Sequence, residues 1–320
     1  MTERLAGDAK SRSGNASARS IEGHGRPLGE EEGPRRGAEP SSATELGHAE
    51  LAQKLDNLES LFNILAQLEG LSERAKHVPR LANVTRTEFL TQYYSANRPV
   101  VLMDFARSWR AFRQWNPTYL SEKLGDENVE VMTSRNRAAG HDVSWEGRRT
   151  VMQFRRYIEL VMSEGIGNDC YLVANNHFFD SPSARELLND VDIDERYLDP
   201  GRMIEGVFLW FGAAGTITPL HHDTCNILFV QVYGRKEFTL VSPFYTPRLY
   251  NDNGFYSSVD PKHPDYGRHP KFEGVDQLEI LLEPGEALLI PVGWWHRVES
   301  LDVCISLSFN NFAYPNRYVW

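Results

Sequence analysis

Two residues of different chemistry, His221 and Asp223, stand one residue apart in the segment GTITPLHHDTCNILFVQVYGRKEF. Alternate residues of a β-strand point to the same face of a sheet, so an imidazole and a carboxylate at this spacing can converge on one point. A third ligand must come from a distant strand, and His296 in EPGEALLIPVGWWHRVESL is well placed. Two histidines and one carboxylate form a facial triad, which leaves three adjacent positions of Fe(II) open for a bidentate oxoacid and O₂. The pattern predicts an iron site made by these three residues.

A His-x-Asp triplet alone is weak evidence, because such triplets are common in surface turns. Here an apolar strand follows the triplet, a basic pair ends that strand, and the late histidine follows another apolar strand and a turn. His222 should point the other way by strand alternation, as a packing or outward-facing residue. His177, in NNHFFD, is as compatible with a loop residue as with a substrate contact.

The elements that must position these residues are mainly short strands. Beyond Val129 the apolar runs are VEVMTS, CYLVANN, VFLWFG, NILFVQVYG, KEFTLVSP, EALLIPVG and VCISLSFN, separated by Gly, Pro, Asn and Asp turn signals. Helical patterns occur around residues 151–163 and 183–190. Many short strands in series predict a mainly β fold with flanking helices, a double-stranded β-helix of the cupin or jelly-roll kind.

The chain before these strands divides into a tail, a helix and a lead-in. Residues 1–44 have almost no large apolar side chains and are expected to be a disordered tail. Residues 45–80 hold an amphipathic helix and a linker, and the catalytic domain is expected over 81–320, with its barrel core at about 170–310. Its lead-in should contain a helix in TRTEFLTQYYS, a strand in PVVLMDF and a helix around 109–115. The apolar stripe of the amphipathic helix comprises Leu51, Leu55, Leu58, Phe62 and Leu65.

Composition excludes several classes of protein. The 320 residues are 41% hydrophobic, enough for a sizeable core, and the net charge of −10 argues against binding nucleic acid by bulk electrostatics. A basic peptide is compatible with this charge. Cys170, Cys225 and Cys304 have no C-x-x-C spacing, so we expect no disulfide framework, no thiolate zinc site and a reducing cytoplasm. Neither a signal peptide nor a membrane-spanning stretch is expected.

Five segments together resemble a known family. CYLVANN, LWFGAAGTITPLHHD, FVQVYGRKEFTLVSP, LEPGEALLIPVGWWH and ISLSF occur in the order found in Jumonji-C oxygenases of the cupin-like subgroup. That subgroup includes factor inhibiting HIF and the small Jumonji-C peptidyl hydroxylases. The resemblance implies Fe(II) as cofactor, 2-oxoglutarate as cosubstrate and O₂ as oxidant.

The resemblance also assigns residues to the cosubstrate. It implies that Lys236, in GRKEF, pairs with the distal carboxylate of 2-oxoglutarate, which agrees with the need for a counter-charge in an apolar pocket. Thr218 and Tyr171 match positions whose hydroxyls bind the same carboxylate, and Ser308 is a weaker match.

The sequence departs from the subgroup in two places. Relatives often have Asn six residues after the first metal histidine, whereas this chain has Ile227 there and Asn226 before it. By strand alternation Asn226 should face away from the iron, so it is not assigned to the site. Factor inhibiting HIF continues past its barrel into dimerising helices, while this sequence ends at Trp320. Any homodimer is therefore expected to use another surface, first of all the Leu51–Leu65 helix, although packing of that helix on its own domain is the simpler interpretation.

Three classes of function are compatible with the sequence. The resemblance favours a hydroxylase of peptide or protein side chains, of which lysine demethylation would be a special case. An oxygenase of a small metabolite or natural-product intermediate is the second class, and a non-catalytic cupin-like binding protein is the third. The intact His/Asp/His set with Lys236 argues against the third, because a binding scaffold does not need it. The sequence does not reveal the prime substrate.

Overall fold

The computed structural model describes residues 42–135, 149–173, 176–251 and 254–318, and the chain divides into two units, Met1–Glu50 and Leu51–Trp320. Most of the expected tail therefore lies outside the described residues. The helices are α1 (Ser42–Gly70), η1 (Glu73–Ala75), α2 (Arg86–Glu88), the π-helix η2 (Phe89–Tyr94), α3 (Arg110–Gln114), α4 (Pro117–Leu124), α5 (Phe154–Glu164), η4 (Phe178–Asp180), α6 (Pro182–Glu186), η5 (Leu187–Asp190), η6 (Pro200–Arg202), α7 (Met203–Gly206), η7 (Pro243–Arg248) and η8 (Pro270–Phe272).

The strands form two sheets. They are β1 (Arg80–Leu81), β2 (Val100–Leu102), β3 (Asn128–Met132), β4 (Arg149–Gln153), β5 (Tyr171–Leu172), β6 (Val207–Gly212), β7 (Ile217–His221), β8 (Ile227–Tyr233), β9 (Lys236–Val241), β10 (Leu278–Leu282), β11 (Ala287–Ile290), β12 (Trp295–Ser300) and β13 (Cys304–Phe309). The nine-stranded sheet has the order β1-β2-β11-β8-β13-β6-β5-β3-β4, and the four-stranded sheet has the order β10-β9-β12-β7. Only β1 and β2 pair in parallel among the described strands.

The two sheets pack face to face over an apolar layer. Alternate residues of their strands point into it, so that Phe229 and Leu288 of the larger sheet lie in one buried cluster with Phe238 and Ile280 of the smaller. The predicted mainly β jelly roll is confirmed. None of the helices in the described part of the chain is long and apolar enough to cross a membrane.

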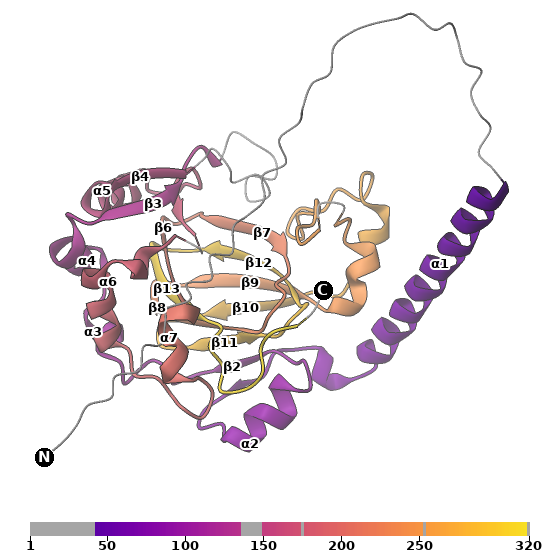
Figure 1. Ribbon diagram of the computed structural model, residues 1–320, viewed down its shortest axis with the longest axis horizontal. Coiled ribbons are helices and arrows are strands. Elements are labelled where there is room, and N and C mark those ends of the chain that lie inside the picture. The colour runs from indigo at the N-terminus through magenta and orange to yellow at the C-terminus, as the bar shows by residue number, and fades with distance from the viewer. Residues whose placement is uncertain (1–41, 136–148, 174–175, 252–253, 319–320) are drawn as a thin grey trace, which may run out of the picture. The chain divides into compact units, whose positions relative to one another are not determined.

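Short helices cover the outer face of the larger sheet, and Figure 1 shows α3, α4, α5 and α6 gathered on that side of the strands. Phe211 of β6 points outward and packs in one cluster with Leu120 of α4 and Phe154 of α5. The hydroxyl of Tyr157 on α5 donates to the carbonyl of Phe211 and accepts from the amide of Leu172 at 2.9 Å. These bonds fix β5, which carries a predicted site residue, against β6.

Among the described side chains of α1, the apolar ones that are buried or half-buried begin at Phe62. Ala66 is buried in a cluster on the outer face of the smaller sheet, and Phe62 and Leu65 are partly buried. The preceding leucines of the stripe are each more than half exposed: Leu51, Leu55 and Leu58. The simpler expectation was that the whole stripe packs on the catalytic domain. This holds for Phe62 and Leu65, but not for Leu51, Leu55 and Leu58.

Candidate metal and cosubstrate site

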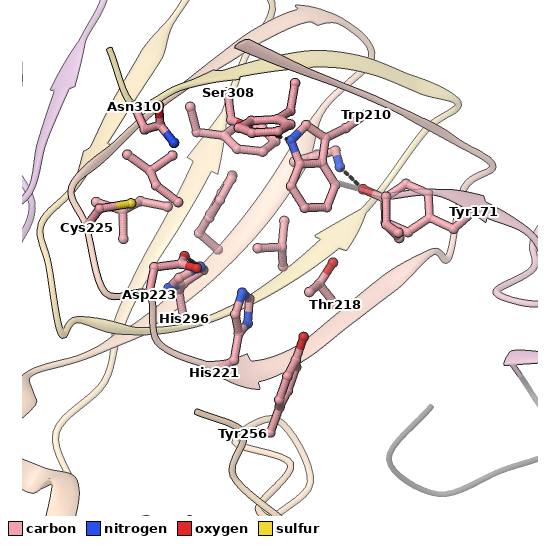
Figure 2. Close-up of a pocket in the computed structure, with 18 of the residues that line it drawn as sticks. Tyr171, Trp210, Thr218, His221, Asp223, Cys225, Tyr256, His296, Ser308 and Asn310 are labelled. Atoms are coloured by element: carbon pink, nitrogen blue, oxygen red, sulfur yellow. Dashed lines mark hydrogen bonds and ion pairs between the residues drawn. The ribbon is translucent and has the colours of Figure 1, made fainter. Parts of the chain in front are cut away.

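The three predicted metal ligands lie together between β7 and β12. His221, the last residue of β7, is the cross-strand partner of His296 on β12, and their ring centroids are 4.1 Å apart. Oδ2 of Asp223 lies 3.4 Å from Nε2 of His296. One ligand atom from each residue lies within 4.8 Å of the others, so a single ion can contact all three. Figure 2 shows the three side chains meeting on one side of a cavity.

Asp223 reaches this point from a turn. The strand β7 ends at His221 and β8 begins at Ile227, so the carboxylate comes from the connection between them. The strand-face reasoning applied to the His221/Asp223 spacing was therefore wrong, although the two side chains do converge. His222 is only 7% exposed and packs its ring on Trp295, with centroids 4.6 Å apart, as expected for a packing residue.

Both histidines present the same nitrogen to the metal position. Nδ1 of His221 lies 2.8 Å from the carbonyl oxygen of Pro219, and Nδ1 of His296 lies 3.0 Å from that of Trp294. A carbonyl oxygen can only accept, so each Nδ1 must carry the proton and donate it. Each Nε2 therefore keeps its lone pair for a metal, and the backbone fixes the plane of each ring.

The electrostatics of this cluster fit a divalent cation. Burial raises the pKa of the Asp223 carboxyl above its ordinary value, against the opposing effect of His221. Burial and the neighbouring His221 lower the pKa of His296 well below its ordinary value. The cluster thus holds a neutral imidazole next to a carboxylate whose charged form is disfavoured, and a bound cation would stabilise that charge. Two nitrogens and one carboxylate oxygen suit Fe(II) better than metals that prefer thiolates.

All seven predicted site residues line one cavity of about 490 Å³: Tyr171, Thr218, His221, Asp223, Lys236, His296 and Ser308. The elements β5, β7, β9, β12, β13 and the β7–β8 turn each contribute to it.

Lys236 supplies a buried positive charge in this cavity, whereas Arg149, which also lines it, pairs with Glu130. The Lys236 side chain is 1% exposed, and its ammonium donates to the hydroxyl of Tyr171 at 2.8 Å. The ammonium also lies 5.3 Å from the Tyr171 ring centroid and 5.4 Å from that of Phe229. No carboxylate of the described residues forms an ion pair with it. A buried ammonium with one hydroxyl as its hydrogen-bond acceptor and two ring faces beside it, among the described residues, is suited to an anionic ligand.

Two further hydroxyls, those of Thr218 and Ser308, line the same cavity. Thr218, on β7, lies between His221 and Tyr171 in Figure 2. The hydroxyl of Ser308 accepts from the indole Nε1 of Trp210 at 2.8 Å, so Ser308 can still donate its own proton to a ligand.

Asn226 faces away from the cavity, whereas Ile227 lines it. The Asn226 carboxamide donates to the side-chain oxygens of Asn316 and Tyr318, both at 2.9 Å, and accepts from the amide of Val292 at 2.9 Å. The predicted orientation of Asn226 is confirmed. Its carboxamide binds the C-terminal segment to the turn before β12.

Other sequence candidates lie outside the site. His177 is exposed and bonds through Nδ1 to Asp180 at 3.1 Å, as a loop residue does. None of the three cysteines forms a disulfide among the described residues, and of the three Cys225 lines the cavity, where burial raises its pKa to about 11.

Sequence reasoning missed several polar and aromatic residues of the cavity, among them Arg149, Trp210, Tyr256 and Asn310. Strand alternation in VFLWFG could have found Trp210. Tyr256 comes from the long connection after β9, where no periodicity exists, and Asn310 follows the end of β13. The Tyr256 ring stacks on His221, with centroids 5.4 Å apart and planes 19° apart, and the two residues pair through the main chain.

Comparison with known proteins agrees with this geometry. The model of the cupin-like domain family matches residues 86–314. This chain belongs to that family. Lysine-specific demethylase JMJ30 of Arabidopsis thaliana is 31% identical over 267 residues, which are 81% of this chain and 60% of the relative. Lysine-specific demethylase 8 of Xenopus tropicalis is 32% identical over 240 residues, which are 72% of this chain and 52% of the relative. HSPB1-associated protein 1 of Homo sapiens is 28% identical over 249 residues, which are 68% of this chain and 48% of the relative.

These relatives place the cupin-like domain among the Jumonji-C oxygenases, which use Fe(II), 2-oxoglutarate and O₂. The resemblance drawn from the sequence is thereby confirmed. The chain spans about half to three fifths of the length of the relatives it matches.

Proposed function

We propose that this chain is an Fe(II)- and 2-oxoglutarate-dependent dioxygenase that hydroxylates a side chain of a peptide or protein. One observation carries the proposal: a single cavity holds both the His221/Asp223/His296 cluster and the buried ammonium of Lys236. A dicarboxylate can be chelated at one end and neutralised at the other only where both features share one space.

Each residue has a separate part in this function. His221, Asp223 and His296 would hold the iron and leave adjacent positions open. Lys236 would pair with the distal carboxylate of 2-oxoglutarate, and the hydroxyls of Tyr171, Thr218 and Ser308 would donate hydrogen bonds to the same carboxylate. The rest of the cavity lining is largely apolar, as is usual for a small-molecule site.

When bound, the iron would supply the activation of O₂, and the chain would supply binding and orientation. The atoms balance as follows: a substrate C–H, O₂ and 2-oxoglutarate give a substrate C–OH, succinate and CO₂. One oxygen atom enters the new hydroxyl and the other enters succinate.

The relatives named as lysine-specific demethylases support a second candidate. Hydroxylation of an N-methyl carbon gives an unstable N-hydroxymethyl group that loses formaldehyde, so demethylation needs the same machinery. The two outcomes differ only in which carbon the cavity presents to the iron.

A direct test uses purified protein with Fe(II) and 2-oxoglutarate, first without and then with candidate substrates. Succinate release without prime substrate excludes a non-catalytic binding protein. Mass spectrometry then distinguishes the gain of one oxygen atom in a peptide from the loss of a methylene unit in a methylated peptide. Turnover with a metabolite collection and none with peptides would contradict the proposal.

Cys170, Cys225 and Cys304 form no disulfide among the described residues, which supports a reducing compartment, and we propose the cytoplasm.

We also propose that the exposed leucines of α1 pack on the same helix of a second copy. Their three- and four-residue spacing is the spacing by which two identical amphipathic helices bury a shared stripe.

A further inference from the structure

A second cavity, of about 660 Å³, adjoins the metal cavity. Both are lined by Thr224, Cys225 and Asn310, so the two spaces adjoin at these residues. The second cavity lies between the end of α7 and the segment that follows β13, and no predicted metal or cosubstrate residue lines it. It therefore extends the site away from Lys236.

The carboxamide of Asn310 stands where the two cavities adjoin. Figure 2 shows its amide group turned into the metal cavity. Its backbone is fixed, because its N–H donates to the carbonyl of Gly206 and its carbonyl accepts from the side chain of Asn316, both at 2.9 Å. The carboxamide itself makes no hydrogen bond within the described part of the chain. One donor group and one acceptor are thus held in place and available to a ligand.

The neighbouring Asn311 repeats this feature in a more buried position. It is 3% exposed, and its Nδ2 donates to the carbonyl of Asp199 at 2.8 Å. Its Oδ1 is buried and has no hydrogen-bond partner. A buried acceptor without a hydrogen-bond partner lowers the stability of the fold, so that such an atom needs a structural or functional explanation. The segment after β13 therefore carries two carboxamides with unused hydrogen-bonding groups, of which that of Asn310 faces the metal cavity and the Oδ1 of Asn311 is covered by protein.

The wall that carries them is held rigidly. Asn226 and Asn316 exchange side-chain and main-chain hydrogen bonds at 2.8 to 2.9 Å, which pin the segment after β13 to the start of β8. Gly206 supports the same wall from the other side, since a Cβ there would lie 2.5 Å from Oδ1 of Asn310. The carboxamide accordingly packs directly on the glycine backbone.

We propose that the second cavity is a main-chain subsite for an extended polypeptide substrate, and that Asn310 holds one of its peptide groups. A carboxamide can donate Nδ2–H to a peptide carbonyl and accept the adjacent peptide N–H at Oδ1, a match in both polarity and charge. The peptide then leads from the second cavity past Cys225 to the metal cavity, where its side chain meets the iron. This inference rests on the proposed peptide hydroxylation and specifies how the substrate is bound.

The experiment uses a mixture of random-sequence peptides with acetylated N-termini and amidated C-termini, so that only the main chain is common to all. The enzyme with Fe(II), 2-oxoglutarate and O₂ is incubated with this mixture, and oxidised peptides are identified by mass spectrometry. The best of them is then used for steady-state kinetics on the wild type, Asn310→Leu and Asn310→Ala. Asn128→Leu is the matched control, because Asn128 is exposed on β3 and lines neither cavity.

The Asn310 variants should raise KM for the peptide about tenfold, as expected for loss of a bidentate hydrogen bond. Succinate release without peptide, measured for each variant, is the internal reference: kcat/KM for the peptide should fall about tenfold relative to it in the Asn310 variants, and the control should match the wild type in both. A peptide that is oxidised with an unchanged KM in both Asn310 variants would overturn the subsite and leave the proposed function intact. Oxidation of metabolites and of no peptide would overturn the proposed function, and the subsite with it.

Discussion

His221 and His296 face each other as partners on neighbouring antiparallel strands, and each anchors its Nδ1 to the carbonyl two residues before it. The register between β12 and β7 shifts directly after His296, before Val298. Such a bulge turns a side chain relative to its strand, which is why bulges are frequent next to active sites. The metal position is therefore set by sheet register and backbone carbonyls, and only Asp223 depends on a turn.

Replacing Asp223 by Ala removes the only anionic ligand. Iron-dependent 2-oxoglutarate turnover should be abolished, and metal affinity should fall by more than the roughly 10- to 100-fold that loss of an outer-shell partner costs. The raised pKa of Asp223 means that the ionised carboxylate destabilises the metal-free fold at neutral pH. Thermal unfolding of the metal-free variant should therefore occur at no lower temperature than in the wild type. Asp180→Ala, exposed at the end of η4, is the control, and undiminished turnover in Asp223→Ala would contradict the assignment.

Lys236→Met keeps the length of the side chain and removes its charge. The apparent KM for 2-oxoglutarate should rise by the equivalent of about 2 to 5 kcal/mol, the cost of leaving a buried carboxylate unpaired. The metal-free protein should become more stable, because a buried ammonium without a counter-charge is lost. Enzyme kinetics and thermal shift with and without 2-oxoglutarate measure both effects, and Lys123→Met, on the surface helix α4, is the control. An unaltered KM would mean that another cation binds the cosubstrate.

The sequence predicted those parts of the site that obey a local rule. Strand runs such as NILFVQVYG and KEFTLVSP became β8 and β9, and alternation placed Asn226 outside the cavity and Ile227 inside. The strands β7 and β10 were absent from the predicted strand runs. β12 was expected as the distant strand that carries His296, although its residues were not among those runs.

Residues whose position depends on long-range packing could not be predicted. Tyr256 lies outside the helices of the β9–β10 connection, and the pairing of its backbone and the stacking of its ring with His221 bring it to the site. The position of the Asn310 side chain depends on two hydrogen bonds of its backbone, one to the carbonyl of Gly206 and one from the side chain of Asn316. Neither relationship leaves a signal in spacing or composition.

Tyr256 offers a test of such a long-range contact. Tyr256→Leu should lower metal affinity about threefold to tenfold, since an aromatic pair contributes about 0.5 to 1.5 kcal/mol and orients the His221 ring. Tyr256→Phe keeps the ring and should bind metal as the wild type does. Titration with Co(II), followed by absorbance, measures both, with the exposed Tyr266→Leu of the same connection as control. Equal affinity in the Leu and Phe variants would show that stacking does not position His221.

The exposed half of the α1 stripe leads to a prediction about assembly. Changing Leu51, Leu55 and Leu58 together to Lys places three charges on the face that we propose to be shared by two copies. Light scattering should then report a monomer in place of a dimer, because like charges and lost apolar area both oppose pairing. The melting temperature of the catalytic domain should stay the same, since Ala66, which anchors the helix, is untouched.

Two controls separate this contact from a general effect of charge or of the preceding chain. Gln53→Lys with Asn57→Lys adds charge to the same helix away from the stripe, and it should leave the dimer intact. Removing residues 1–40 should also leave mass and activity unchanged, because that segment lacks the large apolar side chains that an interface needs. If the wild type is a monomer, or if the triple variant keeps the mass of a dimer, the exposed leucines do not join two copies. A dimer lost only on removal of residues 1–40 would instead place the contact in that preceding segment.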